Sequence, residues 1–313
     1  MKPFFRRGLG SLFLAVMIAC SATMVDAAST RSTKKTRTTV HRTTKVTKSS
    51  VRKRVRRHGA RRGPPGGVVY ARSAVVLDPV TNEVLFQKNA GTSVPIASLT
   101  KLMTAMIFLD HEPDLGRTVE VTREDLSGAG HTQLRRGEIV ALGDLLHMSL
   151  MCSDNVATRV IARECGISRE EFLSQMNKRS AELELTDTRF VEFTGLDERN
   201  VSTANDVAKM LRAAGDNETI RSISTTRKYE FRTASRSHFI GNTNRLLYSR
   251  YQILGGKTGF INEAGYCLAT WVRSDGRDVI AVVLGAPSNA TRFADVVRMV
   301  QKTMKPTFAP IQH

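Results

Sequence analysis

The 313-residue sequence predicts an α+β fold in which both ends of the folded part contribute strands to one antiparallel sheet. Strand-like runs open this part of the chain at residue 68 and return after residue 228. Between them, from residue 98 to about residue 215, apolar residues recur mostly at helical spacing. The expected architecture is therefore an antiparallel sheet covered by helices, with an all-helical subdomain inserted between the strands.

The first two strand-like runs, Val68 to Leu77 and Val84 to Gln87, are rich in β-branched and aromatic residues. The turn-forming residues 78–82 lie between them, so the two runs predict a β-hairpin. Later strands are expected at residues 228–231, 265–272 and 279–284.

Six segments have the apolar periodicity of helices. They are residues 98–110, 142–151, 155–165, 169–183, 204–214 and 290–304. The first is apolar nearly all round, which indicates a buried helix. The last is amphipathic and is expected to cover the sheet.

The net charge of +18 is concentrated near the N-terminus. Residues 28–66 hold 14 Lys and Arg and no acidic residue, whereas residues 67–313 hold 30 basic and 28 acidic side chains. Residues 28–66 show no apolar periodicity and their like charges repel, which predicts a disordered Ser/Thr/Lys/Arg tether. Two interpretations stay open: a solvated spacer, or contact through residues 29–66 with anionic lipid or anionic wall polymers.

Residues 1–27 have the pattern of a secretory signal peptide. Basic residues precede an apolar run from Leu9 to Cys20, and small residues at Val25 and Ala27 have the spacing of a cleavage site. A retained membrane anchor is less favoured because the apolar run is short. A lipoprotein box at 17–20 with an acylated Cys20 is the other alternative. Export to the periplasm or cell envelope argues against a nucleic-acid partner.

The three cysteines beyond the signal are Cys152, Cys165 and Cys267. An odd number leaves at least one thiol free, and their spacing fits no zinc site. Buried packing is the favoured interpretation for each. An exported chain without a disulfide framework suggests a bacterial envelope protein.

The segment Ser98-Leu99-Thr100-Lys101 lies at the start of the buried helix. Residues three apart share a helix face, so Lys101 is expected to reach the Ser98 hydroxyl. Burial lowers the pKa of a lysine, which allows it to accept a proton near neutral pH. The same spacing at residues 32–35 and 50–53 falls in the tether, so the motif alone also fits a capping serine with an exposed lysine.

The segment Ser153-Asp154-Asn155 follows an apolar helix and precedes another. Its simplest interpretation is a helix–helix turn with a capping residue. In an enzyme, the Ser153 hydroxyl can relay a proton to a leaving amine, and the Asn155 amide can hold a substrate carbonyl.

The segment Lys257-Thr258-Gly259 is the most specific of the three. The flanking glycines place it on a strand approached closely by other backbone. Lys257 and Thr258 can bind a substrate carboxylate, and Gly259 allows a ligand to lie against the strand. The alternative is a solvated lysine on an edge strand.

With these motifs in order, residues 68–304 resemble the low-molecular-mass penicillin-binding proteins, serine D-alanyl-D-alanine peptidases with a β-lactamase/transpeptidase-like fold. The likeness extends to residues 188–197, 242–247 and 255–268, and is greatest to the D-alanyl-D-alanine endopeptidase (penicillin-binding protein 7) branch. Two departures are the basic tether and the lack of room after residue 257 for the extra domain of the larger carboxypeptidases.

The resemblance implies a hydrolase of peptidoglycan stem peptides or cross-links, acting in cell wall biogenesis and cell shape. It implies Ser98 as the acylated nucleophile, Lys101 as general base and Ser153 in proton transfer, while Asn155 positions the peptide. Lys257 and Thr258 would bind the substrate carboxylate, and Gly259 would lie beside it. It also implies an oxyanion hole from the N–H groups of Ser98 and Phe260, and β-lactams as covalent inhibitors. No cofactor or metal is implied.

Two other functions stay open on the sequence. A class A-like β-lactamase shares the motifs but needs a glutamate-bearing loop, for which residues 182–186 are the nearest match. A non-catalytic cell-wall-binding envelope protein is the second alternative. The expected organisation is a signal peptide at 1–27, the tether at 28–66 and a catalytic domain at 67–313.

Overall fold

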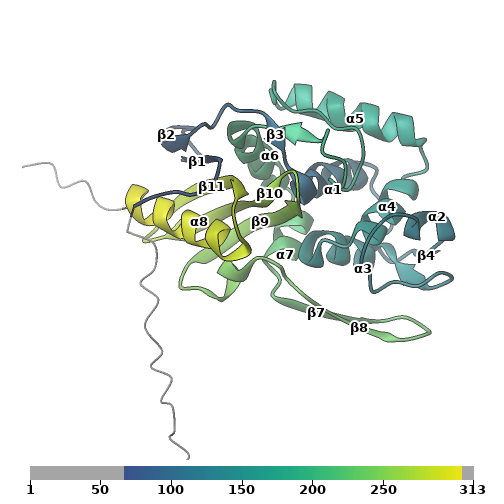
Figure 1. Ribbon diagram of the computed structural model, residues 1–313. Coiled ribbons are helices and arrows are strands. Elements are labelled where there is room, and N and C mark those ends of the chain that lie inside the picture. Colours follow the sequence, from purple (N-terminus) through teal and green to yellow (C-terminus); the bar gives the residue numbers. More distant parts are fainter. Residues whose placement is uncertain (1–66, 305–313) are drawn as a thin grey trace, which may run out of the picture. The chain divides into compact units, whose positions relative to one another are not determined.

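The computed structural model describes residues 67–304 (Figure 1). The expected signal peptide at 1–27, with the alternatives for Cys20, and the expected tether at 28–66 lie outside the described residues. Within the described part, no helix combines the length and the apolar composition that crossing a membrane requires.

A five-stranded sheet forms the centre of the described chain. Its strands lie side by side in the order β2-β1-β11-β10-β9, and each neighbouring pair is antiparallel. The strands are β1 (Ser73–Leu77), β2 (Val84–Lys88), β9 (Gln252–Ile261), β10 (Gly265–Ser274) and β11 (Arg277–Ala286). Within the described residues, β1 therefore pairs with the last strand, β11, which confirms the predicted antiparallel sheet and α+β class.

Both faces of this sheet are buried, because alternate residues of its strands point to opposite sides. In β11, Ile280 and Val282 join the core that contains the helical part, while Ala281 and Val283 join a second core under α8 (Asn289–Thr303). Figure 1 shows α8 lying across one face of the sheet, and α6 (Ala204–Asp216) packs on the other. The sheet is thus a rigid layer between two helical layers.

The remaining helices lie between β2 and β9 in the sequence. They are η1 (Ala97–Leu99), α1 (Thr100–Asp110), α2 (Arg123–Leu126), α3 (Leu142–His147), η2 (Met148–Cys152), α4 (Asn155–Arg163), α5 (Arg169–Glu182), α7 (Glu218–Thr225) and η3 (Arg245–Tyr248). Helix α1 is buried along nearly its whole length, as its all-round apolar sequence predicts. Three short antiparallel pairs complete the fold: β3 (Val94–Pro95) with β6 (Val201–Ser202), β4 (Thr118–Glu120) with β5 (Ile139–Ala141), and β7 (Lys228–Arg232) with β8 (Ser237–Gly241).

Two of the predicted elements differ in their bounds for identifiable reasons. The first strand begins at Ser73 rather than at residue 68, because the N–H groups of Tyr70 and Ala71 donate to the Asp295 carboxylate on α8 instead of to the sheet. The helix expected at 142–151 ends at His147 and continues as the π-helical turn Met148–Cys152. A π-helical turn of this kind often lies beside a functional site.

Candidate active site

Ser98 lies on the tight turn η1, directly before the buried helix α1. Ala97, its predecessor, has a left-handed backbone with φ of 49°, a strained conformation for a residue with a side chain. The Ser98 side chain is only partly buried, whereas Ala97 and Leu99 on either side are fully buried. The turn therefore holds one hydroxyl at the surface of an otherwise closed core.

Lys101 follows one helical turn later and is completely buried. Its Nζ lies 3.0 Å from Ser98 Oγ, 2.7 Å from Asn155 Oδ1 and 2.6 Å from the Thr194 carbonyl oxygen. The amide and carbonyl oxygens can only accept hydrogen bonds, so they engage the two N–H groups of a neutral amine. The remaining lone pair of Nζ then faces the Ser98 hydroxyl, which is the arrangement a general base needs.

Burial lowers the pKa of Lys101 from 10.5 to about 7. The charges of Glu192 and Asp154 act in the opposite direction, but they do not outweigh the loss of hydration. An amine with this pKa is unprotonated in a large fraction of molecules at neutral pH. The predicted contact with Ser98 and the predicted direction of the shift are both present.

Ser153 and Asn155 flank Asp154 at the start of α4. Asp154, not Ser153, caps this helix: its carboxylate accepts from the Ala157 N–H and from the Thr132 hydroxyl. Ser153 itself adopts a left-handed backbone with φ of 64° at the end of the π-helical turn. In this geometry the Ser153 hydroxyl does not cap the helix.

Both ends of the Asn155 amide are hydrogen-bonded within the protein. Its Oδ1 accepts from Lys101, and its Nδ2 donates to the Ala129 carbonyl at 2.9 Å. Asn155 therefore orients the lysine in this structure. Holding a substrate carbonyl, as the sequence predicts, requires the Nδ2 group to exchange its partner.

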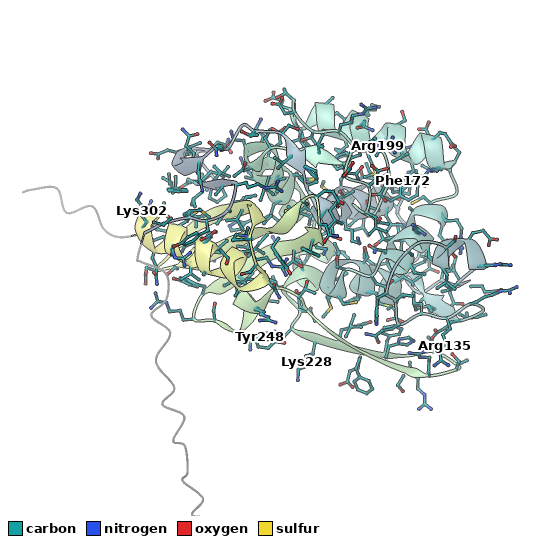
Figure 2. All side chains as sticks on the ribbon, in the orientation of Figure 1. Arg135, Phe172, Arg199, Lys228, Tyr248 and Lys302 are labelled. Carbon is teal, nitrogen blue, oxygen red and sulfur yellow. The ribbon has the colours of Figure 1, made fainter. Side chains whose placement is uncertain are left out.

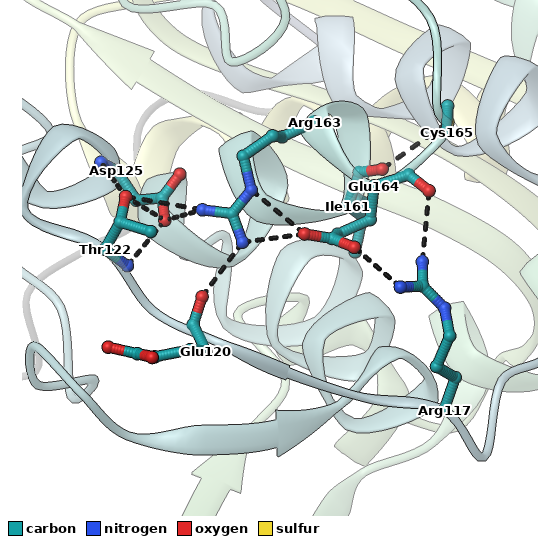
Figure 3. A network of polar contacts seen from close by, with 8 residues as sticks. All are labelled: Arg117, Glu120, Thr122, Asp125, Ile161, Arg163, Glu164 and Cys165. Atoms are coloured by element: carbon teal, nitrogen blue, oxygen red, sulfur yellow. Dashed lines mark hydrogen bonds and ion pairs between the residues drawn. The ribbon is translucent and has the colours of Figure 1, made fainter. Parts of the chain in front are cut away.

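One face of α4 fixes the segment that carries Ala129. Arg159 and Arg163 follow Asn155 at four-residue spacing, so all three point the same way. Arg159 donates to the Asp125 carbonyl at 3.2 Å, and Arg163 binds the Asp125 carboxylate and, at 2.9 Å, the Glu120 carbonyl. Figure 3 shows the outer part of this network, where Glu164 also joins Arg163 to Arg117. The network links β4 and α2 to α4 and so supports the position of Asn155.

Lys257 comes from β9 and lies in the same site. Its Nζ donates to Ser153 Oγ at 2.8 Å and to the Thr258 carbonyl at 2.9 Å. Although β9 is an edge strand, the lysine is only 1% exposed, so the solvated interpretation is wrong. Burial, together with the nearby charge of Lys101, lowers the pKa of Lys257 well below 10.5. The two amines therefore share one environment, and protonation of one disfavours protonation of the other.

Close packing explains the glycine of this strand. A Cβ on Gly259 would lie 3.0 Å from the Ile96 carbonyl oxygen and 3.1 Å from the Ser98 nitrogen. Gly259 thus lets β9 approach the nucleophile's turn, in line with the close backbone approach predicted for this strand, although Gly259 itself was predicted from the sequence to contact a ligand. Next to it, Phe260 is 46% exposed and stacks on Tyr266 at 4.3 Å.

Thr258 is joined to a fourth segment. Its hydroxyl is 2.6 Å from the hydroxyl of Thr243, whose N–H donates to the Met151 carbonyl of the π-helical turn at 3.0 Å. Thr243 therefore connects the strand motif to the turn that ends at Ser153. Residues 242–247 were noted in the sequence only as part of a family likeness.

The loop at residues 192–195, which contacts Lys101 through the Thr194 carbonyl, was not predicted from the sequence. Glu192 accepts hydrogen bonds from Thr194 N at 2.7 Å, Thr194 Oγ1 at 2.6 Å and Asn200 Nδ2 at 2.9 Å, and from Gly195 N. These bonds aim the Thr194 carbonyl at the lysine. No periodic pattern marks such a loop, and its only signal was the family-like stretch 188–197.

Gly195 in this loop cannot tolerate a side chain. Its φ is +82°, and a Cβ would lie 1.9 Å from the Ala97 carbonyl oxygen. We expect Gly195→Ala to lower the free energy of unfolding by at least ~3 kcal/mol, because backbone rather than a flexible side chain must move. Urea unfolding measures this change.

Gly166→Ala is the matched control, since Gly166 has a similar φ of +74° but nothing within 4 Å of its Cβ position. It should lose only about 1 kcal/mol from the left-handed backbone. Equal losses in the two variants would contradict the close approach of the loop to the nucleophile's turn.

Comparison with known proteins finds similar sequences and a similar fold. A family model described as D-alanyl-D-alanine carboxypeptidase (peptidase S11) matches residues 60–288. The D-alanyl-D-alanine endopeptidases of Pseudomonas aeruginosa and Escherichia coli are 36% and 35% identical, each over 72% of this chain and 75% of the relative. Among solved structures, the Streptomyces K15 DD-transpeptidase superposes with a TM-score of 0.72 at 27% identity, covering 77% of this chain and 99% of that protein.

Proposed function

The chain belongs to the D-alanyl-D-alanine carboxypeptidase family, serine peptidases that act on peptidoglycan, and from this premise we propose that it works through an acyl-enzyme on Ser98. The observation that carries the proposal is the 3.0 Å contact between the buried Lys101 amine and the Ser98 hydroxyl. The amine takes the hydroxyl proton as Ser98 Oγ attacks the D-alanyl carbonyl carbon. The negative charge on the carbonyl oxygen is met by the N–H groups of Ser98 and Phe260.

Ser153 completes the first half of the reaction. Because its oxygen accepts from Lys257, its own proton is available for donation. That proton goes to the leaving amine as the peptide C–N bond breaks, and the proton held by Lys101 replaces it. Water then attacks the ester and gives a proton to Lys101, which passes it to Ser98 Oγ as the acyl C–O bond breaks, so that the peptide leaves with a new carboxylate.

Lys257 and Thr258 bind the carboxylate of the leaving side, or the group that replaces it in a cross-link. A carboxylate beside Lys257 supplies the opposite charge that favours the ammonium form of this amine. β-Lactams present a similar acyl group and are expected to acylate the same serine. No metal or cofactor enters these steps.

A β-lactamase would need a carboxylate free to activate water for rapid release of the drug. Glu182 and Glu184, in the stretch that the sequence offered for this role, are exposed at the end of α5. Glu192 lies nearer to Lys101, but both of its oxygens are engaged by Thr194, Gly195 and Asn200. We therefore favour a long-lived penicilloyl-enzyme.

The finer activity we propose is that of an endopeptidase in the periplasm or cell envelope, with a catalytic domain at 67–313 behind a signal peptide and tether. Its support is that relatives at 33–36% identity are named D-alanyl-D-alanine endopeptidases, while those named carboxypeptidases are 28–32% identical. Likeness between sequences thus favours cross-links over free stem ends.

Digestion of whole peptidoglycan followed by mass analysis tests this proposal. We expect cross-linked dimers to become monomers, with little loss of terminal D-alanine from uncross-linked stems. The reverse pattern would show a carboxypeptidase, and no change in either product would contradict the peptidase itself. Penicillin pre-treatment serves as the control, since it should block whichever product forms.

A further inference from the structure

The positive charge of the described fold is gathered in one segment. Residues 221–250 hold seven Lys and Arg and one acidic residue, Glu230. The rest of residues 67–313 carries 23 basic and 27 acidic side chains, so the fold is otherwise slightly acidic. A local excess of this size marks a surface for an anionic partner.

The β7–β8 hairpin displays much of this charge on its outer face. The residues of β7 alternate between exposed and partly buried, and Lys228 and Arg232 are on the exposed side. Phe239 on β8, opposite Glu230, is 64% exposed on the same side. In Figure 1 the hairpin extends well beyond the sheet, along the side of the helical part that carries α3.

The inner face of the hairpin is firmly attached. The Tyr229 hydroxyl donates to Asp144 at 2.7 Å, and its ring stacks on His147 at 3.8 Å. His238 and the Thr233 hydroxyl bond the buried carboxylate of Glu138 at 2.6 Å and 3.0 Å. Burial works against the charge of Glu138, but these hydrogen bonds hold its pKa below the usual value. The outer face is therefore presented on a fixed support.

Other exposed cations lie beside the hairpin at both of its ends. Arg135 and Arg136 precede Glu138 and lie near the hairpin tip, while Arg227 and Arg245 lie at its base. The Arg227 guanidinium is 5.4 Å from the ring of Tyr248, which is 55% exposed. Figure 2 shows Tyr248, Lys228 and Arg135 along one edge of the molecule. We call Arg135, Arg136, Arg227, Lys228, Arg232 and Arg245 the basic ridge.

The base of the ridge is joined directly to the active site. Asn242 donates through its N–H to the Arg227 carbonyl at 3.0 Å, and the next residue, Thr243, bonds Thr258. A polymer held at Ser98 and Thr258 can therefore continue along the hairpin. Peptidoglycan strands carry repeated stem peptides with free carboxylates, which match a row of guanidinium and ammonium groups.

We propose that the basic ridge binds the carboxylate-bearing stem peptides that neighbour the bond being cut, so that the enzyme favours polymeric peptidoglycan over short peptides. This inference rests on the proposed function and names the substrate feature recognised outside the catalytic residues. The large exposed apolar side chains on or beside the ridge, Ile139, Phe239 and Tyr248, are too few for insertion into a lipid surface. Charge complementarity to a carboxylated polymer is the better match.

Sedimentation with insoluble peptidoglycan sacculi tests the ridge. The full chain is used with Ser98→Ala throughout, so that the polymer is not digested. The ridge variant carries Lys228→Gln, Arg232→Gln and Arg245→Gln, whose side chains are exposed. The control variant removes the same charge elsewhere, with Lys178→Gln, Arg189→Gln and Lys302→Gln.

We expect the ridge variant to bind sacculi about tenfold more weakly at low salt and the control variant to change less than about twofold. The difference should shrink as salt rises, and it should vanish on sacculi whose carboxylates have been amidated. Equal weakening in both variants, no weakening, or a difference that persists after amidation would each overturn the proposal. So would a ridge-dependent loss of binding to anionic phospholipid vesicles with sacculus binding unchanged.

Penicillin labelling of the Ser98-containing forms is measured in parallel. Failure of the chain with Ser98 intact to label would contradict the acyl-enzyme. Sedimentation of the Ser98→Ala forms would still test whether the basic ridge binds peptidoglycan. The two proposals can therefore fail separately.

Discussion

Replacing Ser98 by alanine is expected to abolish covalent labelling by penicillin and to lower the rate of D-alanyl bond hydrolysis by at least about 10⁴-fold. The variant lacks the hydroxyl that lies 3.0 Å from the Lys101 amine, so no ester can form at this point. Fluorescent penicillin followed by gel electrophoresis measures the first effect. Release of peptide from cross-linked dimers measures the second.

The fold should survive this substitution. Lys101 keeps its bonds to Asn155 and Thr194, and the alanine loses only a partly exposed hydroxyl. A thermal midpoint within a few degrees of the parent is expected. Labelling at wild-type extent in the variant would remove Ser98 from the role of nucleophile.

Ser153→Ala is the matched control, because it deletes a second hydroxyl of the same site and leaves Ser98 in place. It should still label, but more slowly by about 10²-fold or more, as expected for loss of a proton donor. The comparison separates the group that forms the ester from the group that moves the proton.

Replacing Lys101 by methionine is expected to slow acylation by about 10³- to 10⁴-fold. Methionine fills a similar volume, but its thioether sulfur is far too weak a base to take the Ser98 proton. In the parent enzyme, protonated Lys101 cannot act as a base, so acylation should rise with pH and level off above about 7. In the variant this inflection should be absent. Stopped-flow acylation by penicillin across pH 5 to 9 measures both effects.

Asn155→Asp provides a control that leaves the amine in place. A carboxylate where Asn155 Oδ1 now accepts from Lys101 at 2.7 Å favours the ammonium form, so the pKa of Lys101 and the inflection should move to higher pH. An inflection near pH 7 that persists in Lys101→Met would instead assign the titration to another group, with Lys257 the nearest amine of lowered pKa.

The predictable parts of the site are those set by local sequence. The contact between Ser98 and Lys101 follows from three-residue spacing on one buried helix, and the strand position of Lys257 follows from its glycine-rich surroundings. The antiparallel sheet and most helices likewise follow from apolar periodicity. For the Ser98–Lys101 contact and for each helix and strand the decisive interactions are local. The pairing of β1 with the distant β11 was predicted instead from the strand-like runs at both ends of the folded part.

The unpredicted parts depend on contacts between distant segments. The Thr194 carbonyl reaches Lys101 from 93 positions away, and Thr243 bonds Thr258 from a separate turn. Neither residue belongs to a periodic element that would mark it. Some local backbone conformations also could not be predicted. One is the left-handed conformation of Ala97 before the nucleophile, because alanine rarely adopts it. The exposed side of the β7–β8 hairpin was missed because β8 was not predicted as a strand.

The site is assembled from residues 98–101, 153–155, 194–195, 243 and 257–259, and every one of these segments touches another across a long stretch of chain. A chain emerging from synthesis lacks the contacts of Lys257 with Ser153 and of Thr258 with Thr243 until β9 has been made and has docked. We therefore expect incomplete chains to lack peptidase activity. The fraction of molecules that penicillin acylates should then measure the fraction that has folded completely.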